Sequence, residues 1–271
     1  MGRKQSGEKR VAVLGGSTTW GFGLRAGQDF PAQLQRLITA HNEKINVLNL
    51  GFNSEGAYSF TQTLTDYDYL DADLVVLYSG YNDLNAPNYY NFRHRSPIFA
   101  ATGYLPLLPS LTVDKLTVWK QKLMGEKDRA VFSPPHLDQQ NGSSHLPEQL
   151  GTLTGKAPED MKPGAASCSP EWQFYCDRIS VVADLALGKG KRVLIVGEPY
   201  ITDPHIVQQH ELQNFLRNRY AGQSKLGYVD LGRTVDLRDQ SLCWDGMHLT
   251  EEGNRRIAAA LSEPVRDMLR K

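Results

Sequence analysis

Five short runs of apolar residues recur along the chain, and most of their positions are Val, Ile or Leu. They do not alternate between apolar and polar residues, as a strand with one face in water would. Short continuous apolar runs are typical of strands that are buried on both faces of a parallel sheet. The runs are Val11–Leu14, Ile45–Leu50, Leu74–Tyr78, Val193–Val196 and Tyr228–Leu231.

Between these runs the apolar residues return every three or four positions, which is the spacing of one helix face. In the first such segment Phe30, Leu34 and Ile38 share a face. The predicted helices cover Asp29–His41, Tyr58–Leu70, Trp172–Leu187, His205–Tyr220 and a last segment that begins after Thr250. Strands that alternate with helices form right-handed βαβ units, so the pattern predicts an α/β protein with three α/β/α layers.

The last helix carries its own start signal. Thr250 is a suitable N-cap, and the charges of Glu251 and Glu252 favour a helix N-terminus. Pro264 lies within the same segment and has no N–H to donate, so we expect it to kink or restart this helix.

The alternation stops between Asn85 and Pro170, where many prolines and no convincing strand occur. A short amphipathic helix over Val113–Met124 is the clearest element there. Loops this long in a compact domain are usually functional or disordered. We interpret residues 1–271 as one domain in which residues 85–170 form a large insertion. The insertion is either a lid or pocket wall beside a site, or a surface addition, and both interpretations stay open.

The length and composition of the chain disfavour several classes of function. A chain of 271 residues can bury one substantial core. The formal net charge is zero, which does not favour nucleic acid or an anionic membrane as a partner. No apolar stretch reaches the roughly 20 residues of a membrane span. The polar, basic start has no signal-peptide h-region, and it fits either a cytoplasmic start or the remainder of a removed leader.

The three cysteines, Cys168, Cys176 and Cys243, do not have the spacing of a metal site. An oxidising compartment would allow a bridge between Cys168 and Cys176, but we expect free thiols. We predict no metal and no organic cofactor.

Near the C-terminus Asp245 precedes His248 by three residues. At this spacing the carboxylate can accept a hydrogen bond from the imidazole, which orients the ring and leaves its other nitrogen free as a base. Such a pair implies a nucleophile, and Ser17 follows the first apolar run directly after Gly15 and Gly16. A serine hydroxyl becomes reactive when a base accepts its proton. We therefore predict Ser17, His248 and Asp245 as the catalytic residues.

Two more short polar segments directly follow predicted strands, where the ligand-binding loops of an open α/β sheet lie. They are Asn49–Gly51 and Ser79–Asp83. Ester hydrolysis needs donors for a developing oxyanion. We predict that these are the backbone N–H groups of Ser17 and Gly51 and the side-chain amide of Asn82. Glycine at position 51 would let the backbone approach the substrate closely.

With Ser17, Gly51, Asn82 and His248 in separate blocks, the chain resembles the SGNH, or GDSL-type, hydrolases. Asp245 matches the aspartate of their last block. The resemblance covers Arg10 to Asp83 and Glu171 to the C-terminal helix, but not the insertion. It implies a flavodoxin-like sheet with the strand order 2-1-3-4-5 and ester hydrolysis without a cofactor.

One position departs from the family pattern. The first block usually reads Gly-Asp-Ser-Leu, whereas this chain has Gly15-Gly16-Ser17-Thr18. The missing aspartate is neither nucleophile nor base, but a hydrogen-bonding anchor of the loop is lost. The Gly-Gly-Ser-Thr-Thr variant resembles bacterial members that act outside the cytoplasm, which slightly favours that location.

Several neighbouring residues have a structural as well as a functional interpretation. Trp20 and Phe22 could line an acyl pocket, although we expect at least one of them to pack in the core. We expect Asp83 to hold its loop and Glu198 to lie at the rim of the site. The histidines outside the last block, including His205, are expected to be ordinary surface residues.

We predict a serine esterase that acts through an acyl-serine intermediate. Short acyl groups, such as acetyl on a carbohydrate, are favoured because no strongly hydrophobic surface segment is evident. A lipase- or lysophospholipase-like activity and acyl transfer to a sugar hydroxyl would use the same residues and stay open, as does a non-catalytic carbohydrate-binding protein. The partner would be a small-molecule, glycan or lipid ester, and the oligomeric state is left open.

A different class of protein is also conceivable, in which Gly15–Thr19 is a phosphate-binding loop. No lysine follows the glycines and no acidic ribose partner is evident, which disfavours it. It would also leave the pair of Asp245 and His248 without a role.

Overall fold

The computed structural model describes residues 3–39, 44–84, 97–102 and 167–270. The chain divides into two compact units, one of residues 1–88 and 143–271 and the other of residues 89–142. In the second unit the described residues form the short helix α4 (Pro97–Thr102). Nearly all of the predicted insertion, including the helix expected over Val113–Met124, lies outside the described residues.

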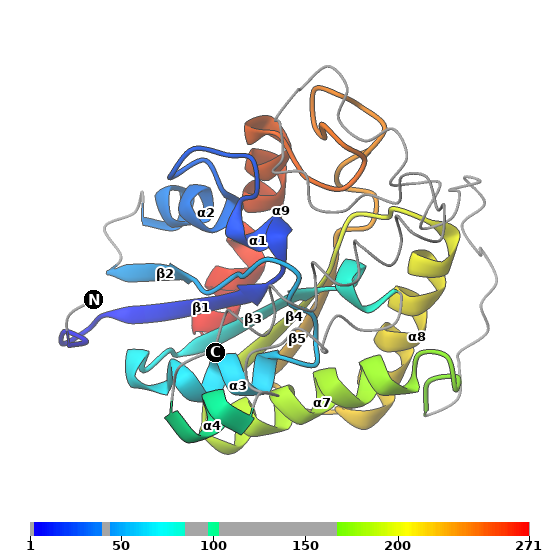
Figure 1. Cartoon of the computed structure of the whole chain (residues 1–271). Helices are drawn as coiled ribbons and strands as arrows, with labels where there is room; N and C mark the ends of the chain where they lie inside the picture. Colours follow the sequence, from blue (N-terminus) through cyan, green and yellow to red (C-terminus); the bar gives the residue numbers. More distant parts are fainter. Residues whose placement is uncertain (1–2, 40–43, 85–96, 103–166, 271) are drawn as a thin grey trace. The chain divides into compact units, whose positions relative to one another are not determined.

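All five predicted strands are present and form one parallel sheet in the first unit (Figure 1). Its order is β2-β1-β3-β4-β5, which confirms the order 2-1-3-4-5 and the α/β class. The strands are β1 (Lys9–Gly15), β2 (Ile45–Asn49), β3 (Leu74–Ser79), β4 (Arg192–Gly197) and β5 (Leu226–Asp230).

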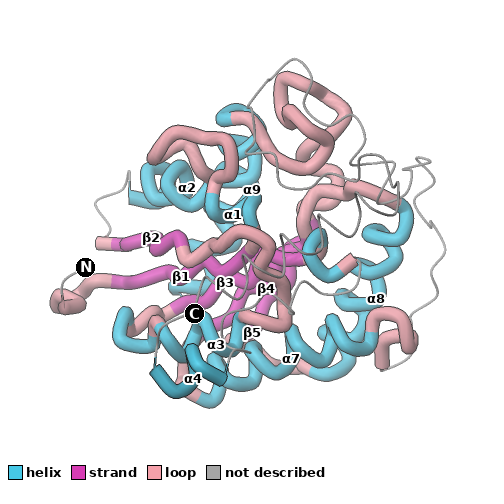
Figure 2. The backbone as a smooth tube through the Cα atoms, viewed as in Figure 1, coloured by secondary structure: helices cyan, strands magenta, loops and turns pink. Residues whose placement is uncertain are grey.

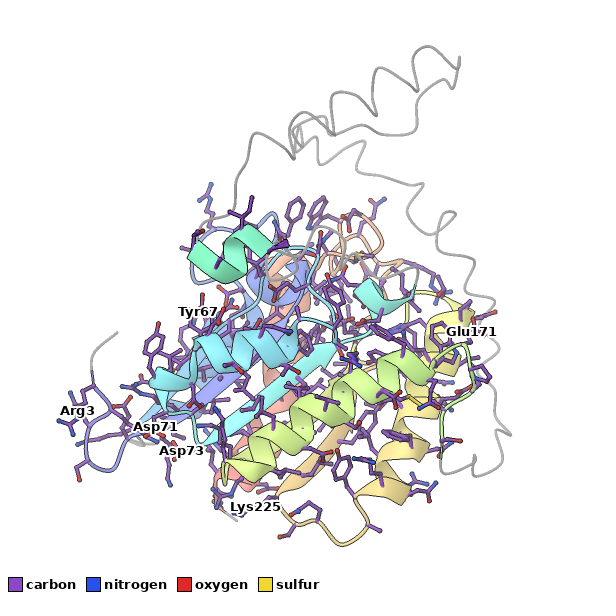
Figure 3. All side chains as sticks on the ribbon, turned by 60° about the horizontal axis from the view of Figure 1, so that its bottom comes forward. Arg3, Tyr67, Asp71, Asp73, Glu171 and Lys225 are labelled. Carbon is purple, nitrogen blue, oxygen red and sulfur yellow. A yellow bond between two sulfur atoms is a disulfide. The ribbon has the colours of Figure 1, made fainter. Side chains whose placement is uncertain are left out.

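Both faces of the sheet are covered, as the continuous apolar runs predict. In β1, Val11 and Val13 belong to a core on one face, and Ala12 and Leu14 belong to a core on the other. The helices α2 and α9 pack on the first face, and α3, α7 and α8 pack on the second (Figures 1 and 2). Figure 3 shows α3 and α7 side by side over that second face. The sheet is therefore the middle layer of three.

The five predicted helices are present with small differences at their ends, and the short helix α1 and the 3₁₀ turn η2 were not predicted. The helices and 3₁₀ turns of the first unit are α1 (Ser17–Trp20), α2 (Phe30–Thr39), α3 (Phe60–Asp66), η1 (Asp68–Leu70), η2 (Tyr81–Asp83), α7 (Gln173–Gly188), α8 (Asp203–Arg219) and α9 (Glu251–Arg270). The helix expected over Tyr58–Leu70 is thus split into α3 and a 3₁₀ turn. The helix α8 begins earlier than expected because the Thr202 hydroxyl caps it by accepting a hydrogen bond from the N–H of His205.

The last helix starts as predicted, since the Thr250 hydroxyl accepts a hydrogen bond from the N–H of Gly253. It does not restart at Pro264, because α9 runs through that residue to Arg270. Ile257, Leu261 and Val265 are fully buried on both sides of the proline, so packing outweighs the loss of one backbone hydrogen bond.

The expectation of free thiols at Cys168 and Cys176 is wrong, because the two form a disulfide. Their Cα atoms are 6.5 Å apart, within the range that a disulfide can span. The bridge joins the segment that precedes α7 to the first turn of this helix, which the spacing of eight residues alone did not reveal. Cys243 is a buried free thiol.

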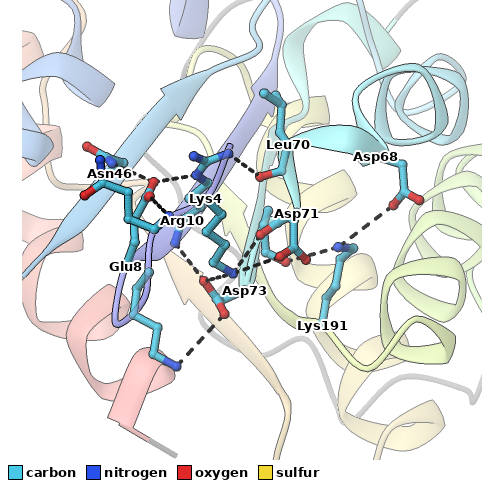
Figure 4. A network of polar contacts seen from close by, with 12 residues as sticks. Lys4, Glu8, Arg10, Asn46, Asp68, Leu70, Asp71, Asp73 and Lys191 are labelled. Carbon is cyan, nitrogen blue, oxygen red and sulfur yellow. Dashed lines mark hydrogen bonds and ion pairs between the residues drawn. The ribbon is translucent and has the colours of Figure 1, made fainter. Parts of the chain in front are cut away.

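A polar network closes the amino-terminal end of the sheet (Figure 4). The Glu8 carboxylate accepts hydrogen bonds from Arg10 (2.5 Å) and Asn46 (2.8 Å), and these bonds lower its pKa to about 2. Lys4 pairs with Asp73 at 2.8 Å beside them. This network lies at the opposite end of the strands from the candidate site. No helix among the described residues is long and apolar enough to cross a membrane.

Candidate active site

The turn that presents Ser17 is built around two glycines. The strand β1 ends at Gly15, and α1 begins at Ser17. A Cβ atom on Gly15 would lie 2.0 Å from Thr19 Oγ1, and one on Gly51 would lie 2.8 Å from Thr19 Cβ. Only glycine therefore fits at both positions while Thr19 is buried between them. The turn places Ser17 at the carboxyl end of the sheet.

The structure brings Ser17, His248 and Asp245 together. Ser17 Oγ lies 2.9 Å from His248 Nε2, and His248 Nδ1 lies 2.5 Å from Asp245 Oδ2. The loop after β5 therefore returns to the turn after β1, 231 residues away along the chain. In this arrangement Nδ1–H donates to the carboxylate, and Nε2 is left to accept the serine proton.

Asp245 is held in place by its own loop. Its Oδ1 accepts hydrogen bonds from the N–H groups of Met247 (2.9 Å) and His248 (2.6 Å). Burial by itself would raise the pKa of Asp245, but the hydrogen bonds and charge of His248 hold it below its ordinary value. The carboxylate is therefore ionised near neutral pH, when it can orient and stabilise an imidazolium.

Two aromatic rings contact the His248 imidazole. The ring centroids of Phe22 and His248 are 4.7 Å apart, and those of Trp244 and His248 are 5.4 Å apart. Phe22 also stacks on Trp244 at 5.8 Å. Phe22 thus packs against the histidine, whereas Trp20 is 50% exposed. The rings of Phe22 and Trp244 restrict the imidazole to the orientation that faces Ser17.

Asn82 lies beside the serine turn, in the 3₁₀ turn η2 that follows β3. Its side-chain amide donates a hydrogen bond to the backbone carbonyl of Glu55 at 2.8 Å. A Cβ atom on Gly16 would lie only 2.2 Å from Asn82 Nδ2, so this amide rests on the Cα atom of Gly16. In this structure a side chain at position 16 would therefore displace the amide of Asn82.

The backbone N–H of Gly51 takes part in a hydrogen bond within its own loop. It donates to Asn49 Oδ1 at 2.9 Å, and the amide of Asn49 in turn donates to the carbonyl of Thr19 at 2.8 Å. Trp20 and Thr19 pack on the Cα atom of Gly51, where a Cβ atom would lie 2.6 Å from the backbone nitrogen of Trp20, so this packing requires glycine. The N–H of Ser17 forms no hydrogen bond with any other described residue.

Two buried carboxyl groups lie behind the serine turn. Asp83 accepts from the N–H of Ala57 at 3.1 Å, which joins the loops after β2 and β3. Glu198, at the end of β4, accepts from Thr18 and from the N–H of Tyr81. Burial raises the pKa of Asp83 to about 7 and that of Glu198 to about 8, against the opposite effect of these hydrogen bonds.

Sequence reasoning placed Glu198 at the rim, but the side chain is only 2% exposed. Its position directly after a predicted strand was the one sequence feature that pointed to a place near the site. The expectation that His205 is a surface residue is also wrong. It is fully buried on α8, and burial lowers its pKa to about 3. Within the described residues no group of three or more His, Cys, Asp or Glu side chains is placed to hold a metal ion.

The sequence matches no protein-family model and no curated protein. Solved structures do match over nearly the whole chain. A putative lipolytic protein of the G-D-S-L family from Desulfitobacterium hafniense has a TM-score of 0.51 at 12% identity, and the match covers 94% of this chain and 99% of that one. The chain has the SGNH hydrolase fold.

Carbohydrate esterases share this SGNH fold. A family 3 carbohydrate esterase from Clostridium thermocellum has a TM-score of 0.52 at 15% identity, and the match covers 97% of this chain and 98% of that one. A variant of an acetyl-xylooligosaccharide esterase from Geobacillus has a TM-score of 0.50 at 14% identity, with coverage of 96% and 94%. The resemblance drawn from the four sequence blocks is thus confirmed at the level of the fold.

Proposed function

We propose that this chain is a serine esterase. The observation that carries the proposal is the continuous contact from Ser17 Oγ to His248 Nε2 and from His248 Nδ1 to Asp245. A serine, a histidine and a buried carboxylate in this order are the components of nucleophilic acyl transfer. The SGNH fold, which is shared with esterases and lipolytic proteins, supports the same activity.

In the proposed reaction, Ser17 Oγ attacks the ester carbonyl while its proton passes to His248 Nε2. Asp245 stabilises the imidazolium that forms. The tetrahedral intermediate collapses when His248 returns the proton to the leaving alcohol, and an acyl-serine remains. Water then attacks this ester with His248 as the base, which releases the acid and restores Ser17.

The oxyanion would be bound by the N–H of Ser17 and the amide of Asn82. One amide hydrogen of Asn82 is used by Glu55, and the second is available for a substrate oxygen. The N–H of Gly51 would contribute as the third donor when it exchanges its bond to Asn49 Oδ1 for one to the oxyanion. Each such donor is typically worth about 10²–10³ in turnover.

We propose short acyl groups on a carbohydrate alcohol as the substrate class. Trp20 and Phe52 are 50% and 59% exposed, and they follow the Ser17 and Gly51 positions closely along the chain. Exposed aromatic rings present flat apolar faces with which a sugar ring can pack. Two of the structures that share the fold are esterases named for carbohydrate substrates.

The disulfide between Cys168 and Cys176 supports a location outside the cytoplasm. Disulfides persist in oxidising compartments and are rare where thiols are kept reduced. A secreted or surface-exposed enzyme would also meet polymeric carbohydrate esters.

The test is hydrolysis of p-nitrophenyl esters with acyl chains of about two to sixteen carbons, measured for the wild type and for Ser17→Ala. Ser262→Ala, on the exposed side of α9, is the matched control. We expect turnover that is lost in Ser17→Ala, retained in Ser262→Ala and highest for acetyl. An optimum at long chains would instead indicate a lipase-like enzyme, and full activity in Ser17→Ala would refute the proposal.

A further inference from the structure

The buried carboxyl group of Glu198 contacts both loops that carry the candidate catalytic groups. Thr18 Oγ1 donates to Glu198 Oε1 at 3.0 Å, and the N–H of Tyr81 donates to Glu198 Oε2 at 2.7 Å. Thr18 directly follows Ser17, and Tyr81 directly precedes Asn82. A single side chain, directly after β4, therefore joins the turn after β1 to the turn after β3.

The two turns are also in direct contact with each other. The Asn82 amide rests on Gly16, where an added Cβ atom would lie 2.2 Å from its nitrogen. Gly80, at the start of the second turn, also passes close to Glu198, since a Cβ atom there would lie 3.2 Å from Glu198 Oε2. The turns thus touch each other directly on one side and are joined through a carboxyl group on the other.

We propose that Glu198 is a positioning residue, which holds the Ser17 turn and the Asn82 turn at the separation that ester hydrolysis requires. This inference rests on the proposed esterase function. Glu198 has no contact with the hydroxyl of Ser17 or with the amide of Asn82, so it acts through Thr18 and Tyr81.

The residue type suits this role. A carboxyl group offers two oxygen acceptors on one short planar unit, and here each oxygen takes one donor from a different turn. Because the group is buried, water cannot replace a lost partner, and an unpaired donor in the interior is costly. A displacement of about 1 Å between a nucleophile and an oxyanion donor can reduce turnover by about 10²-fold.

The test uses two variants that remove the contact from opposite sides. Glu198→Met keeps the length of the side chain and removes both acceptors, whereas Thr18→Val keeps the shape of threonine and removes one donor. We expect kcat to fall about 10–100-fold in Glu198→Met and less in Thr18→Val, with KM changed by no more than about twofold. The double variant should be no slower than Glu198→Met, because both changes break the same contact.

Glu8→Gln is the matched control. Glu8 is another buried, hydrogen-bonded carboxylate, but it lies in the network at the opposite end of the sheet and contacts neither turn. Its replacement should leave kcat and KM unchanged at a temperature where the variant is folded. If Glu198→Met does not fold, Thr18→Val carries the test by itself, since it leaves the bond to Tyr81 in place.

Hydrogen exchange provides a measurement that does not depend on catalysis. In Glu198→Met, peptides that cover residues 15–22 and 80–84 should exchange faster than in the wild type, while the strands stay protected. A kcat equal to that of the wild type in Glu198→Met and Thr18→Val, or a change in KM alone, would refute the inference, as would unchanged exchange in both turns. The two proposals can fail separately. If the wild type hydrolyses no ester, the esterase function is refuted. If the two turns still exchange faster in Glu198→Met than in the wild type, the joining of the turns by Glu198 is supported.

Discussion

Replacement of Glu198 by glutamine should change how the stability of the protein depends on pH. Glutamine keeps the size and shape of the side chain and can still reach Thr18 and Tyr81, but it cannot ionise. The comparison therefore isolates the ionisation of one buried carboxyl group. Burial raises the pKa of this group from the ordinary 4.5 of a glutamate to about 8 in the folded protein.

The magnitude follows from this difference. A raised pKa means that between pH 4.5 and about 8 the folded protein holds a proton that the unfolded chain releases. The contribution of the group to stability is therefore fully present below pH 4.5 and is lost as the pH rises through about 8. At about 1.4 kcal/mol for each pKa unit, the difference of about 3.5 units corresponds to a total contribution of about 5 kcal/mol to the free energy of unfolding. About 4 kcal/mol of this contribution should be lost between pH 5 and pH 8.5.

The assay is urea denaturation of the wild type and Glu198→Gln at pH 5 and at pH 8.5, with the disulfide intact. Titrating groups that do not interact with Glu198 contribute equally to both proteins and cancel in the difference. Asp83 is the exception, because its charge helps to raise the pKa of Glu198. The free energy of unfolding of the variant, relative to the wild type, should rise by several kcal/mol from the lower to the higher pH. A difference that stays constant within about 0.5 kcal/mol would refute the assignment of Glu198 as a buried group with a raised pKa.

Three further predictions concern the site and its support. Asn82→Ala should lower kcat by about 10²–10³-fold with little change in KM, because the amide would act on the oxyanion; steady-state kinetics that show a loss of affinity alone would contradict this role. Gly16→Ala should lower kcat at least about 10-fold, because the added Cβ atom would displace the amide of Asn82. Gly188→Ala is the control and should leave kcat unchanged, because a Cβ atom there meets nothing within 4 Å. Replacement of Cys168 and Cys176 by serine should lower the free energy of unfolding by about 2–3 kcal/mol, as expected for a loop closed over eight residues, and equal urea midpoints with and without the bridge would contradict it.

The secondary structure could be predicted because local patterns carry it. The three inner strands β1, β3 and β4 contain continuous buried apolar runs, because a strand buried on both faces has no polar face to interrupt such a run. The helix boundaries were less accurate where a local contact decides them. The 3₁₀ turn after α3 and the early start of α8 depend on individual hydrogen bonds rather than on periodicity.

The buried polar groups were the least predictable part of the candidate site. His205 and Glu198 are polar residues, which are usually exposed, yet both are buried. Glu198 is buried where donors from two distant loops meet its oxygens, and His205 is buried against the rings of Tyr81 and Tyr200. Such burial depends on partners that are far away in sequence.

The sequence by itself determined the class of fold and the residue types of the candidate site. Apolar periodicity follows from local backbone geometry, and a serine, an asparagine and an Asp-x-x-His segment can be recognised wherever they meet in space. Only the tertiary structure decided that Ser17 and His248 lie 2.9 Å apart, that Asn82 rests on Gly16, and that Cys168 and Cys176 are bridged. The physical reason is that contacts between remote segments are set by the packing of layers on the sheet, which no local pattern encodes.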